Sequence, residues 1–440
     1  MGTTFRPYDP DQQLLLPEDL KEWVPAGHLA HHVSDPVDAL DLGAFYAPYE
    51  GDGRRNRPYD PRMVVKVLLY GYATGVFSSR KLSRKLEEDV ALRMLAAGNF
   101  PRHRTLCDFR KTHLEVFGAL FAEVVRLARE LGLAELGRVA VDGTKVRANA
   151  SKRKAMSHGR MGPEEIRLEE EIAELLAAAE AADAAEDARY GEDVRGDELP
   201  EELKRREDRL AAIRAAKARL EAEARERDEA RGRKPEWERN PKGGPPYKLE
   251  YGEPEAKAQS NFTDPESRIM KTSTEGYQQC YNAQAAMDGE SQLVVGTAVT
   301  AGASDQGWLT EMLDVVDEVC GETPGEVLAD AGYCGEEELA ELEARGIDGY
   351  VALGREGKAS AGIDPESCPA KARMAQKLAA PAGRAVYAKR KWIAEAPIGW
   401  IKEAMGFRRF SLRGLENVRG EWDLVCLALN VRRMHVLLAA

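Results

Sequence analysis

The sequence lacks the features that would place the protein in a membrane, outside the cell or on a zinc-bound scaffold. No apolar run approaches about 18 residues and the N-terminus has no signal-peptide pattern, so we expect neither membrane insertion nor export. Six cysteines are scattered without a close pair, which argues against a disulfide framework or a zinc knuckle and is typical of a reducing cytoplasm. The seven histidines show no ligand spacing.

An overall positive charge, common in proteins that hold nucleic acid, is also missing, because the formal net charge is −12. The acidity is concentrated: residues 163–202 contain sixteen Asp and Glu and only three Arg. In contrast, residues 54–113 carry fourteen Lys and Arg with five acids, and residues 384–440 carry eleven with five. This segregation is compatible with phosphate contacts by the two ends of the chain, although basic faces are often only solvated.

Residues 1–135 are predicted to be helical. Proline at a first helical turn followed by apolar residues at helical spacing predicts a helix over 61–72, and basic amphipathic and apolar patterns predict further helices over 80–86 and 114–131. Thr105, with an acid three residues later, has the pattern of a helix start. Short helices with clustered arginines suit a helix-turn-helix DNA reader, but a dimerisation or packing domain explains them equally well.

Residues 155–257 differ from the preceding segment in composition and in the spacing of their apolar residues. Residues 164–189 are rich in Ala and Glu, and a later segment has heptad spacing at Leu203, Leu210, Ile213 and Leu220. The broken stretch 191–200 separates the two, which predicts an antiparallel helical hairpin, and the Arg/Lys/Pro/Gly-rich run 231–246 is predicted to be a loop. We see no catalytic constellation in this insertion and expect a role in dimerisation or spacing.

From residue 258 the pattern is that of strands alternating with helices. Asp288-Gly289, between apolar segments 276–287 and 292–301, predicts a hairpin, and Ser304-Asp305 are expected to cap a helix that runs to about Val319. Further strands are expected at 326–330 and 350–353, with a short helix at 336–345 between them. Together with the strand before Asp142, these elements predict a mixed α/β sheet.

Two of these predicted strands have the same sequence pattern, because each is expected to end in an aspartate followed by a small, turn-prone residue. Asp142 and Asp330 would lie at the ends of neighbouring strands, where such a sheet places its site. A third acid, Glu395, precedes Pro397 and is expected at or just before a helix start. Three such carboxylates suit a site with two Mg²⁺ ions, which can activate an attacking oxygen and stabilise a leaving one at phosphorus.

Each of these residues also has a purely structural explanation. Asp142 and Asp330 could be turn aspartates, and Glu395 could complement a helix dipole. Lys402, seven residues after Glu395, could be a surface lysine. Asp305 could line the site together with residues 282–284, but it is at least as well explained as a helix cap.

Short motifs occur in a fixed order along the chain: Arg57-Pro58-Tyr59-Asp60-Pro61, Val141-Asp142-Gly143-Thr144, Thr263-Asp264-Pro265-Glu266-Ser267, Gly276-Tyr277 through Tyr281-Asn282-Ala283-Gln284-Ala285, Ala329-Asp330-Ala331-Gly332-Tyr333, and Glu395 to Lys402 with Gly406-Phe407-Arg408-Arg409-Phe410. This ordered set resembles the DDE transposases of bacterial insertion sequences and covers most of the chain. The branch it resembles has a helical N-terminal domain and an insertion after the first catalytic strand.

The resemblance implies an RNase H-like catalytic core in which Asp142, Asp330 and Glu395 are the catalytic, metal-binding triad for two Mg²⁺ ions, with Mn²⁺ as a substitute. Other positions match the family's DNA-phosphate contacts or are candidates for backbone contacts: Tyr387, Arg390, Lys402, Arg408, Arg409 and Arg413. The usual pattern places three residues between the arginine and the glutamate. Here Arg390 is followed by four, whereas Lys391 has the expected spacing and could share the phosphate role.

We therefore expect an α/β protein whose RNase H-like mixed-sheet catalytic core is interrupted by a helical hairpin insertion and preceded by an all-helical N-terminal domain. The expected division is a helical domain (1–135), the first part of the core (136–154), the insertion with its basic loop (155–257) and the remainder of the core with C-terminal helices (258–440).

The expected activity is that of a transposase in the bacterial cytoplasm, associated with the nucleoid when bound to DNA. It would bind the terminal inverted repeats of its own element, cut DNA with metal-activated water and join the freed 3′-hydroxyl to target DNA. A homodimer, formed through the hairpin over 163–222, would hold two double-stranded ends. The alternatives are a metal-dependent nuclease of the same fold without strand transfer, and a catalytically inactive DNA-binding or assembly protein.

Overall fold

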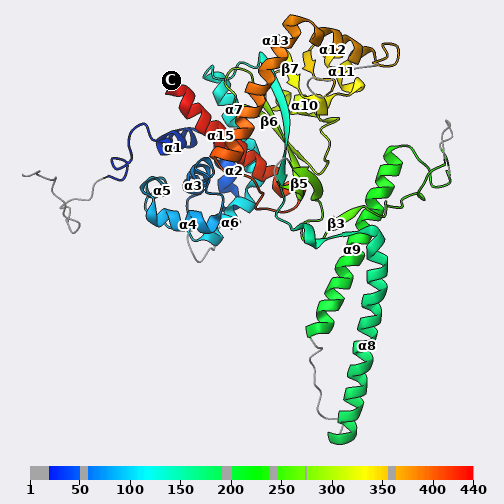
Figure 1. The fold of residues 1–440 in the computed structure, drawn as a ribbon. Coiled ribbons are helices and arrows are strands. Elements are labelled where there is room, and N and C mark those ends of the chain that lie inside the picture. The colour runs from blue at the N-terminus through cyan, green and yellow to red at the C-terminus, as the bar shows by residue number, and fades with distance from the viewer. Residues whose placement is uncertain are drawn as a thin grey trace, which may run out of the picture.

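The computed structural model describes residues 19–49, 58–190, 201–237, 239, 246–272, 275–354 and 363–439. The predicted fold class is confirmed: a helical N-terminal region precedes a mixed sheet with helices, and a long helical hairpin interrupts that sheet after its first strand (Figure 1). Within the described residues, no helix combines the length and the apolar character needed to cross a membrane. Arg57 of the first motif, the break at 191–200 and much of the loop at 231–246 lie outside the described residues.

The N-terminal region consists of short helices: α1 (Leu29–Ala39), α2 (Gly43–Tyr46), the 3-10 turn η1 (Ala47–Tyr49), α3 (Pro61–Ala73), α4 (Ser79–Glu88), α5 (Val90–Leu95), α6 (His103–Thr112) and α7 (Leu114–Glu130). Asp60 caps α3 by accepting a hydrogen bond of 2.8 Å from the Arg62 amide. The helix start predicted at Thr105 is wrong, since α6 begins at His103 after the extended Arg102, and no side chain caps it. The buried faces of these helices and of the sheet form one continuous hydrophobic core.

The sheet consists of β1 (Arg138–Arg147), β4 (Arg268–Thr272), β5 (Gly276–Asp288), β6 (Val294–Thr300), β7 (Glu326–Ala329) and β8 (Asp348–Val351). β1 lies at its centre, antiparallel to β5 on one side and parallel to β7 on the other, and β8 continues beyond β7. β4 and β6 share the outer edge of β5. The hairpin predicted around Asp288-Gly289 is confirmed as β5 and β6.

β1 does not end at the predicted position. Its parallel pairing with β7 stops at the pair Val141 and Ala329, but its antiparallel pairing with β5 continues from Asp142 to Arg147. The Asp142-Gly143 pair is therefore part of a continuous strand and forms no turn. The physical reason is the length of β5, which offers hydrogen-bonding partners to β1 beyond the point where β7 has ended.

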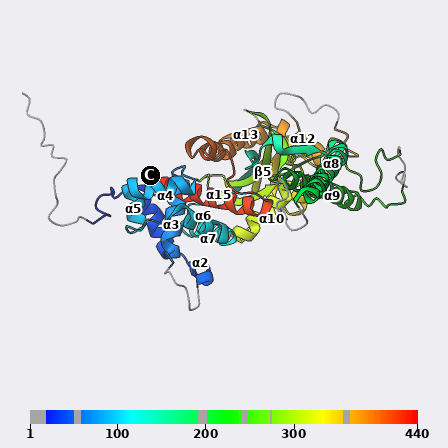
Figure 2. The same cartoon turned by 90° about the horizontal axis from the view of Figure 1, so that it is seen from below.

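The helical insertion projects from the core as α8 (His158–Tyr190) and α9 (Glu201–Ala230), which confirms the predicted antiparallel hairpin (Figure 1). All four residues with heptad spacing are buried: Leu203, Leu210, Ile213 and Leu220. Ion pairs across the hairpin, such as Arg206 with Glu171 at 2.9 Å, fix its register. At its base, β2 (Ala155–Ser157) pairs with β3 (Gln259–Asn261). Figure 2 shows the N-terminal helices and the hairpin at opposite ends of the molecule.

After β6 the chain forms α10 (Trp308–Cys320), the 3-10 turn η3 (Ala331–Tyr333), α11 (Glu336–Ala344), α12 (Pro369–Ala379) and α13 (Pro381–Arg390). A helical path continues without a break through η4 (Lys391–Glu395), α14 (Ala396–Gly399) and η5 (Trp400–Ala404), and α15 (Leu415–Leu438) ends the described chain. α15 packs against α3, α7 and β6, so it joins the N-terminal helices to the sheet.

Candidate active site

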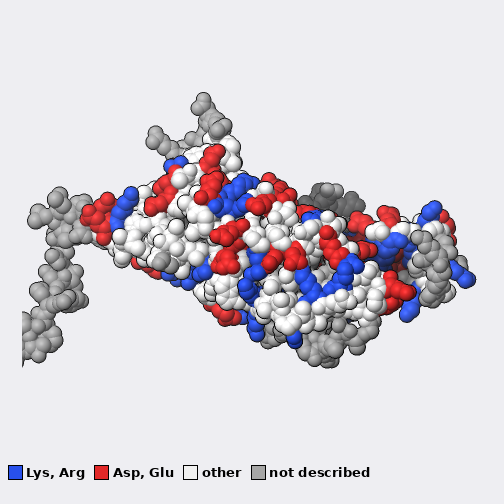
Figure 3. All heavy atoms as spheres, turned by 90° about the horizontal axis from the view of Figure 1, so that it is seen from above, with Lys and Arg blue, Asp and Glu red and all other residues white. Residues whose placement is uncertain are grey.

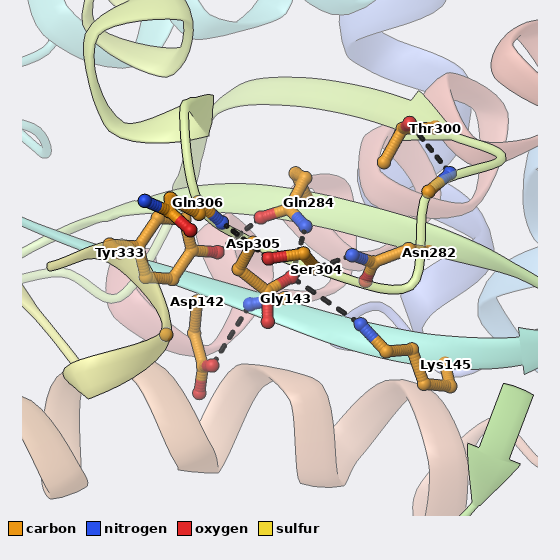
Figure 4. A network of polar contacts seen from close by, with 12 residues as sticks. Asp142, Gly143, Lys145, Asn282, Gln284, Thr300, Ser304, Asp305, Gln306 and Tyr333 are labelled. Atoms are coloured by element: carbon orange, nitrogen blue, oxygen red, sulfur yellow. Dashed lines mark hydrogen bonds and ion pairs between the residues drawn. The ribbon is translucent and has the colours of Figure 1, made fainter. Parts of the chain in front are cut away.

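Asp142 projects from the middle of β1 towards the helical path that carries Glu395 (Figure 4). One carboxylate oxygen accepts a hydrogen bond of 2.9 Å from the Gly143 amide, and the other lies 3.7 Å from Nη1 of Arg390. Burial raises the pKa of Asp142 to about 6; Arg390 opposes this shift and the nearby Asp330 adds to it. The site thus holds an acid whose charged form needs a cation.

Asp330 follows directly after β7, and its side chain accepts a hydrogen bond of 2.8 Å from the amide of Gly332. Because the parallel register pairs Val141 with Ala329, the next residues of the two strands, Asp142 and Asp330, lie side by side. The predicted juxtaposition of the two aspartates on neighbouring strands is therefore present, although only β7 ends there.

Glu395 does not precede a helix start, so this expectation is wrong. It lies within the helical path from Pro381 to Ala404, as the last residue of the π-helical turn η4. Pro397 follows in the first turn of α14. A π-turn spaces its backbone hydrogen bonds one residue wider than an α-turn, so the chain can pass through a proline, which lacks an amide hydrogen, without ending the helix.

The same π-turn explains the unusual spacing between Arg390 and Glu395. Residues five apart share a face of a π-turn, whereas residues four apart share a face of an α-helix. Accordingly, the guanidinium of Arg390 lies 3.7 Å from Oε1 of Glu395 and also 3.7 Å from Oδ2 of Asp142. Lys391, which has the spacing expected from the family, is exposed and forms no hydrogen bond or ion pair with a described residue.

The three predicted acids therefore converge, but Arg390 stands between two of them. Within the described residues, no three His, Cys, Asp or Glu side chains form a ready-made metal cage. The donor set nevertheless fits a hard divalent ion, because it consists of carboxylate oxygens and Mg²⁺ needs only one or two of them when it keeps its waters. Asp142 and Asp330, side by side and partly exposed, are the residues placed to hold such an ion.

A polar network on the other side of β1 contains residues that the sequence left ambiguous (Figure 4). Oδ1 of Asp305 accepts hydrogen bonds from Asn282 at 2.6 Å and Gln284 at 2.8 Å, and Nζ of Lys145 lies 3.4 Å away. Tyr333 donates a hydrogen bond to Oε1 of Gln284. The helix-cap prediction for Asp305 is wrong: α10 starts only at Trp308 and has no side-chain cap.

Two glycines beside the aspartates make room for Asp305. A Cβ at Gly143 would lie 2.6 Å from Oδ1 of Asp305, and one at Gly332 would lie 3.2 Å from its Oδ2. Neither glycine has a positive φ, so a turn conformation does not require them. In the sequence, the signal for this arrangement was a glycine one or two positions after each aspartate. Its role could not be predicted from the local sequence, because the side chain that it accommodates, Asp305, belongs to a different part of the chain.

The remaining predicted DNA contacts lie along the helical path and the segment after it. Tyr387 is half-buried on α13, 5.9 Å beneath the guanidinium of Arg390. Arg408 is exposed and pairs with Glu403 at 2.5 Å. Arg409 and Arg413, also exposed, both donate hydrogen bonds to Asn149, which follows β1. Viewed from above, acidic and basic side chains are interspersed, so this face presents no single basic surface (Figure 3).

Comparisons with known families agree with this architecture. A family model described as "Transposase DDE domain" matches residues 253–431, and one described as "Transposase domain (DUF772)" matches residues 18–112. No significant match to a curated protein or to a solved structure was found. The fold and the matched core define a nucleic-acid-processing enzyme.

More specifically, the two matches together indicate a DDE transposase of an insertion sequence. This family generally depends on divalent metal ions. The matched DDE segment includes Asp330 and Glu395, whereas Asp142 precedes it because the helical hairpin separates β1 from the rest of the sheet.

Proposed function

We propose that this transposase binds the terminal inverted repeats of an insertion sequence and catalyses both DNA cleavage and strand transfer at one site. Asp142, Asp330 and Glu395 are proposed as its catalytic carboxylates. The observation that carries the proposal is their convergence from separate elements: β1, the end of β7 and the π-turn η4. Asp142 and Asp330 are partly buried and lie side by side, so they need a cation for stability, and phosphoryl transfer needs cations at the reacting phosphate.

Divalent ions, Mg²⁺ or Mn²⁺, would be held by Asp142 and Asp330 with Glu395 at the far side, and would activate the attacking oxygen and stabilise the leaving one. The protein's own residues orient the reactants. Arg390 bridges Asp142 and Glu395 before DNA enters, and it can then offer its guanidinium to a phosphate. Because water and a 3′-hydroxyl attack phosphorus in the same geometry, one site can serve both steps.

The DNA is proposed to lie over residues of the helical path and the segment after it: Tyr387, Arg390, Lys402, Arg408, Arg409 and Arg413. Lys391 is left out of this set, because Arg390 and not Lys391 lies against the acids. A homodimer would hold two ends of the element together in the cytoplasm, with the α8–α9 hairpin as the proposed contact. The second candidate function is cleavage without strand transfer. It is retained because the carboxylate arrangement suits hydrolysis and transesterification equally.

The decisive experiment measures cleavage of a duplex that carries the end of the flanking element, with and without Mg²⁺, for the parent and for Asp330→Asn. We expect cleavage by the parent to require the metal and to fall by at least a hundredfold in the variant, because a ligand of the ion is lost. Equal cleavage by the two proteins would remove Asp330 from the site. Binding of the duplex by both proteins without any cleavage would support the inactive DNA-binding protein instead.

Strand transfer is tested separately with a pre-cut end bearing a free 3′-hydroxyl and a supercoiled target plasmid. Covalent joining of the end to the plasmid is expected for the parent. A parent that cleaves but never joins would be a nuclease, the second candidate. Lys391→Ala serves as a matched control, because Lys391 is exposed on the same π-turn and forms no ion pair with the acids within the described residues.

A further inference from the structure

The half of β1 beyond Asp142 forms one wall of a groove, and the charged residues of that wall, Lys145 and Arg147, have no role in the proposed function. We call this groove the β1 groove. It begins at Gly143 and Thr144, beside Asp142, and its charged lining residues come from three parts of the chain: Lys145, Arg147, Glu275, Lys402, Glu403 and Arg408. Four cations and two acids therefore line the groove, and Lys145 has a further acidic partner outside the lining, Asp305 at 3.4 Å. Lys145 and Arg147 lie two positions apart on the strand, so their side chains leave the same face about 6.6 Å from each other.

Lys402 is the strongest indication of a ligand in this groove. Its half-buried side chain forms no hydrogen bond or ion pair with a described residue. Burial lowers the pKa of Lys402 and the neighbouring Arg408 lowers it further, so the charged amine is held at a cost. An anion entering the groove would supply the missing counter-charge.

Two further cations of the groove, Arg147 and Arg408, lie on segments that are joined by backbone hydrogen bonds. The Arg147 amide donates to the Arg408 carbonyl at 3.3 Å, and the Phe410 amide donates to the Arg147 carbonyl at 2.8 Å. The segment that carries Arg408 is thus fixed alongside the outer end of β1. The side chains of Arg147 and Arg408 therefore line the groove from two segments of the chain that are held side by side.

The acids of the groove are poorly suited to be permanent partners. Glu275 pairs with Arg147 at 2.6 Å, but both side chains are about 40% exposed. Glu403 pairs with Arg408 at 2.5 Å and is 71% exposed. Exposed pairs of this kind contribute little stability, so a phosphate, which offers more acceptor oxygens, can displace the glutamates.

From these observations we infer that the β1 groove binds the phosphodiester backbone of the cleaved DNA strand, on the nucleotides next to the reacting phosphate. Lys145, Arg147 and Lys402 would contact successive phosphates as the strand leaves Asp142. This inference rests on the proposed function and adds to it a path for the strand and two contacts on β1, neither of which belongs to the motifs around Glu395.

The test compares two substitutions with opposite expected effects. Arg147→Gln removes a phosphate contact, so affinity for an end-containing duplex should fall several-fold and the salt dependence of binding should flatten by about one unit in slope. Glu275→Gln frees Arg147 from its partner, so affinity should rise. Binding is measured by fluorescence anisotropy in EDTA, where no cleavage occurs, over a series of salt concentrations.

Position along the strand is tested with duplexes in which one phosphate at a time is replaced by an uncharged methylphosphonate. The parent should lose affinity when a phosphate adjacent to the cleavage point is neutralised, and Arg147→Gln should be insensitive at that same phosphate. Arg345→Gln, which breaks an exposed ion pair on α11 outside the groove, is the matched control.

The inference is overturned if Arg147→Gln and Glu275→Gln both bind like the parent and Arg345→Gln while the parent binds and cleaves the duplex. If the parent neither binds nor cleaves an end-containing duplex, the proposed function fails instead. Both variants change exposed side chains, and their thermal unfolding should match that of the parent.

Discussion

The carboxyl group of Asp142, proposed above as catalytic, lies in an environment that disfavours its charged form. Burial raises its pKa to about 6 from the ordinary 3.8. Since the folded protein binds this proton more tightly than the unfolded chain does, ionisation of Asp142 lowers stability as pH rises from about 4 to about 6, and the full cost remains above pH 6. A shift of this size corresponds to roughly 3 kcal/mol at most.

The isosteric Asp142→Asn variant should therefore unfold at a higher temperature than the parent at pH 8 without metal, and the difference should vanish near pH 4. Thermal unfolding followed by circular dichroism over this pH range checks it. Added Mg²⁺ should raise the melting temperature of the parent and leave the variant unchanged. A variant less stable than the parent at pH 8 would show that the contact with Arg390 outweighs the burial of the charge.

A second prediction at the scale of one residue concerns Gly143. Its missing side chain accommodates Asp305, and an added Cβ would come within 2.6 Å of both Asp305 and Gln284. Gly143→Ala should lose about 1–3 kcal/mol in urea unfolding, since a packed polar network must shift. The control is Gly137→Ala, just before β1, where an added Cβ meets no atom within 4 Å. Equal stability of the two variants would contradict this explanation of the glycine.

Among the elements, the π-turn η4 decides which cation faces the acids. It places Arg390, rather than Lys391, against Asp142 and Glu395. We expect Arg390→Ala to reduce cleavage of an element end at least tenfold, in line with the loss of contacts to charged groups worth roughly 1.5–3 kcal/mol. Lys391→Ala should stay within about twofold of the parent, since surface substitutions away from packed or paired groups have small effects. The measurement is the single-turnover rate of cleavage for each variant. If the turn were an ordinary α-turn in the active protein, Lys391 would face the acids instead of Arg390, and Lys391→Ala would then be the slower variant.

Across the whole molecule, a buried polar network ties the N-terminal helices to the catalytic core. The guanidinium of Arg110 on α6 donates to Tyr72 on α3 at 2.7 Å and lies 4.0 Å from Glu421 on α15. Glu421 in turn accepts hydrogen bonds of 2.9 Å from the amides of Ser411 and Leu412, in the segment that follows Arg408 and Arg409. One buried carboxylate therefore connects the helical domain to the basic segment beside the β1 groove.

Removing one member of this network should leave the other charged and unpaired inside the protein. Arg110→Met or Glu421→Gln should each cost roughly 3 kcal/mol in urea unfolding, and the double variant should cost clearly less than their sum. The same variants should weaken DNA binding if the segment after Arg408 loses its position. Strict additivity would mean that Arg110 and Glu421 do not act on one another.

Local patterns along the chain were sufficient to predict the elements and their class. The hairpin at Asp288-Gly289, the strand before Asp330 and the heptads of the insertion depend on side chains close in sequence, whose periodicity reflects one buried face. The residue types at Asp142, Asp330 and Glu395 likewise indicated oxygen ligands and phosphoryl transfer. These features were determined by the sequence alone.

Only the tertiary structure decided how far β1 extends, whether the helix continues through Glu395 and Pro397, and which residues Asp305 contacts. β1 continues because β5, a strand far away in sequence, pairs with it. The helix continues past Pro397 because a π-turn changes the spacing of its backbone hydrogen bonds. The side chain of Asp305 contacts Asn282, Gln284 and Lys145 and does not cap α10. Each outcome depends on partners far apart in sequence. A local pattern contains no information about such partners, and their contacts outweigh the weak preferences of single residues.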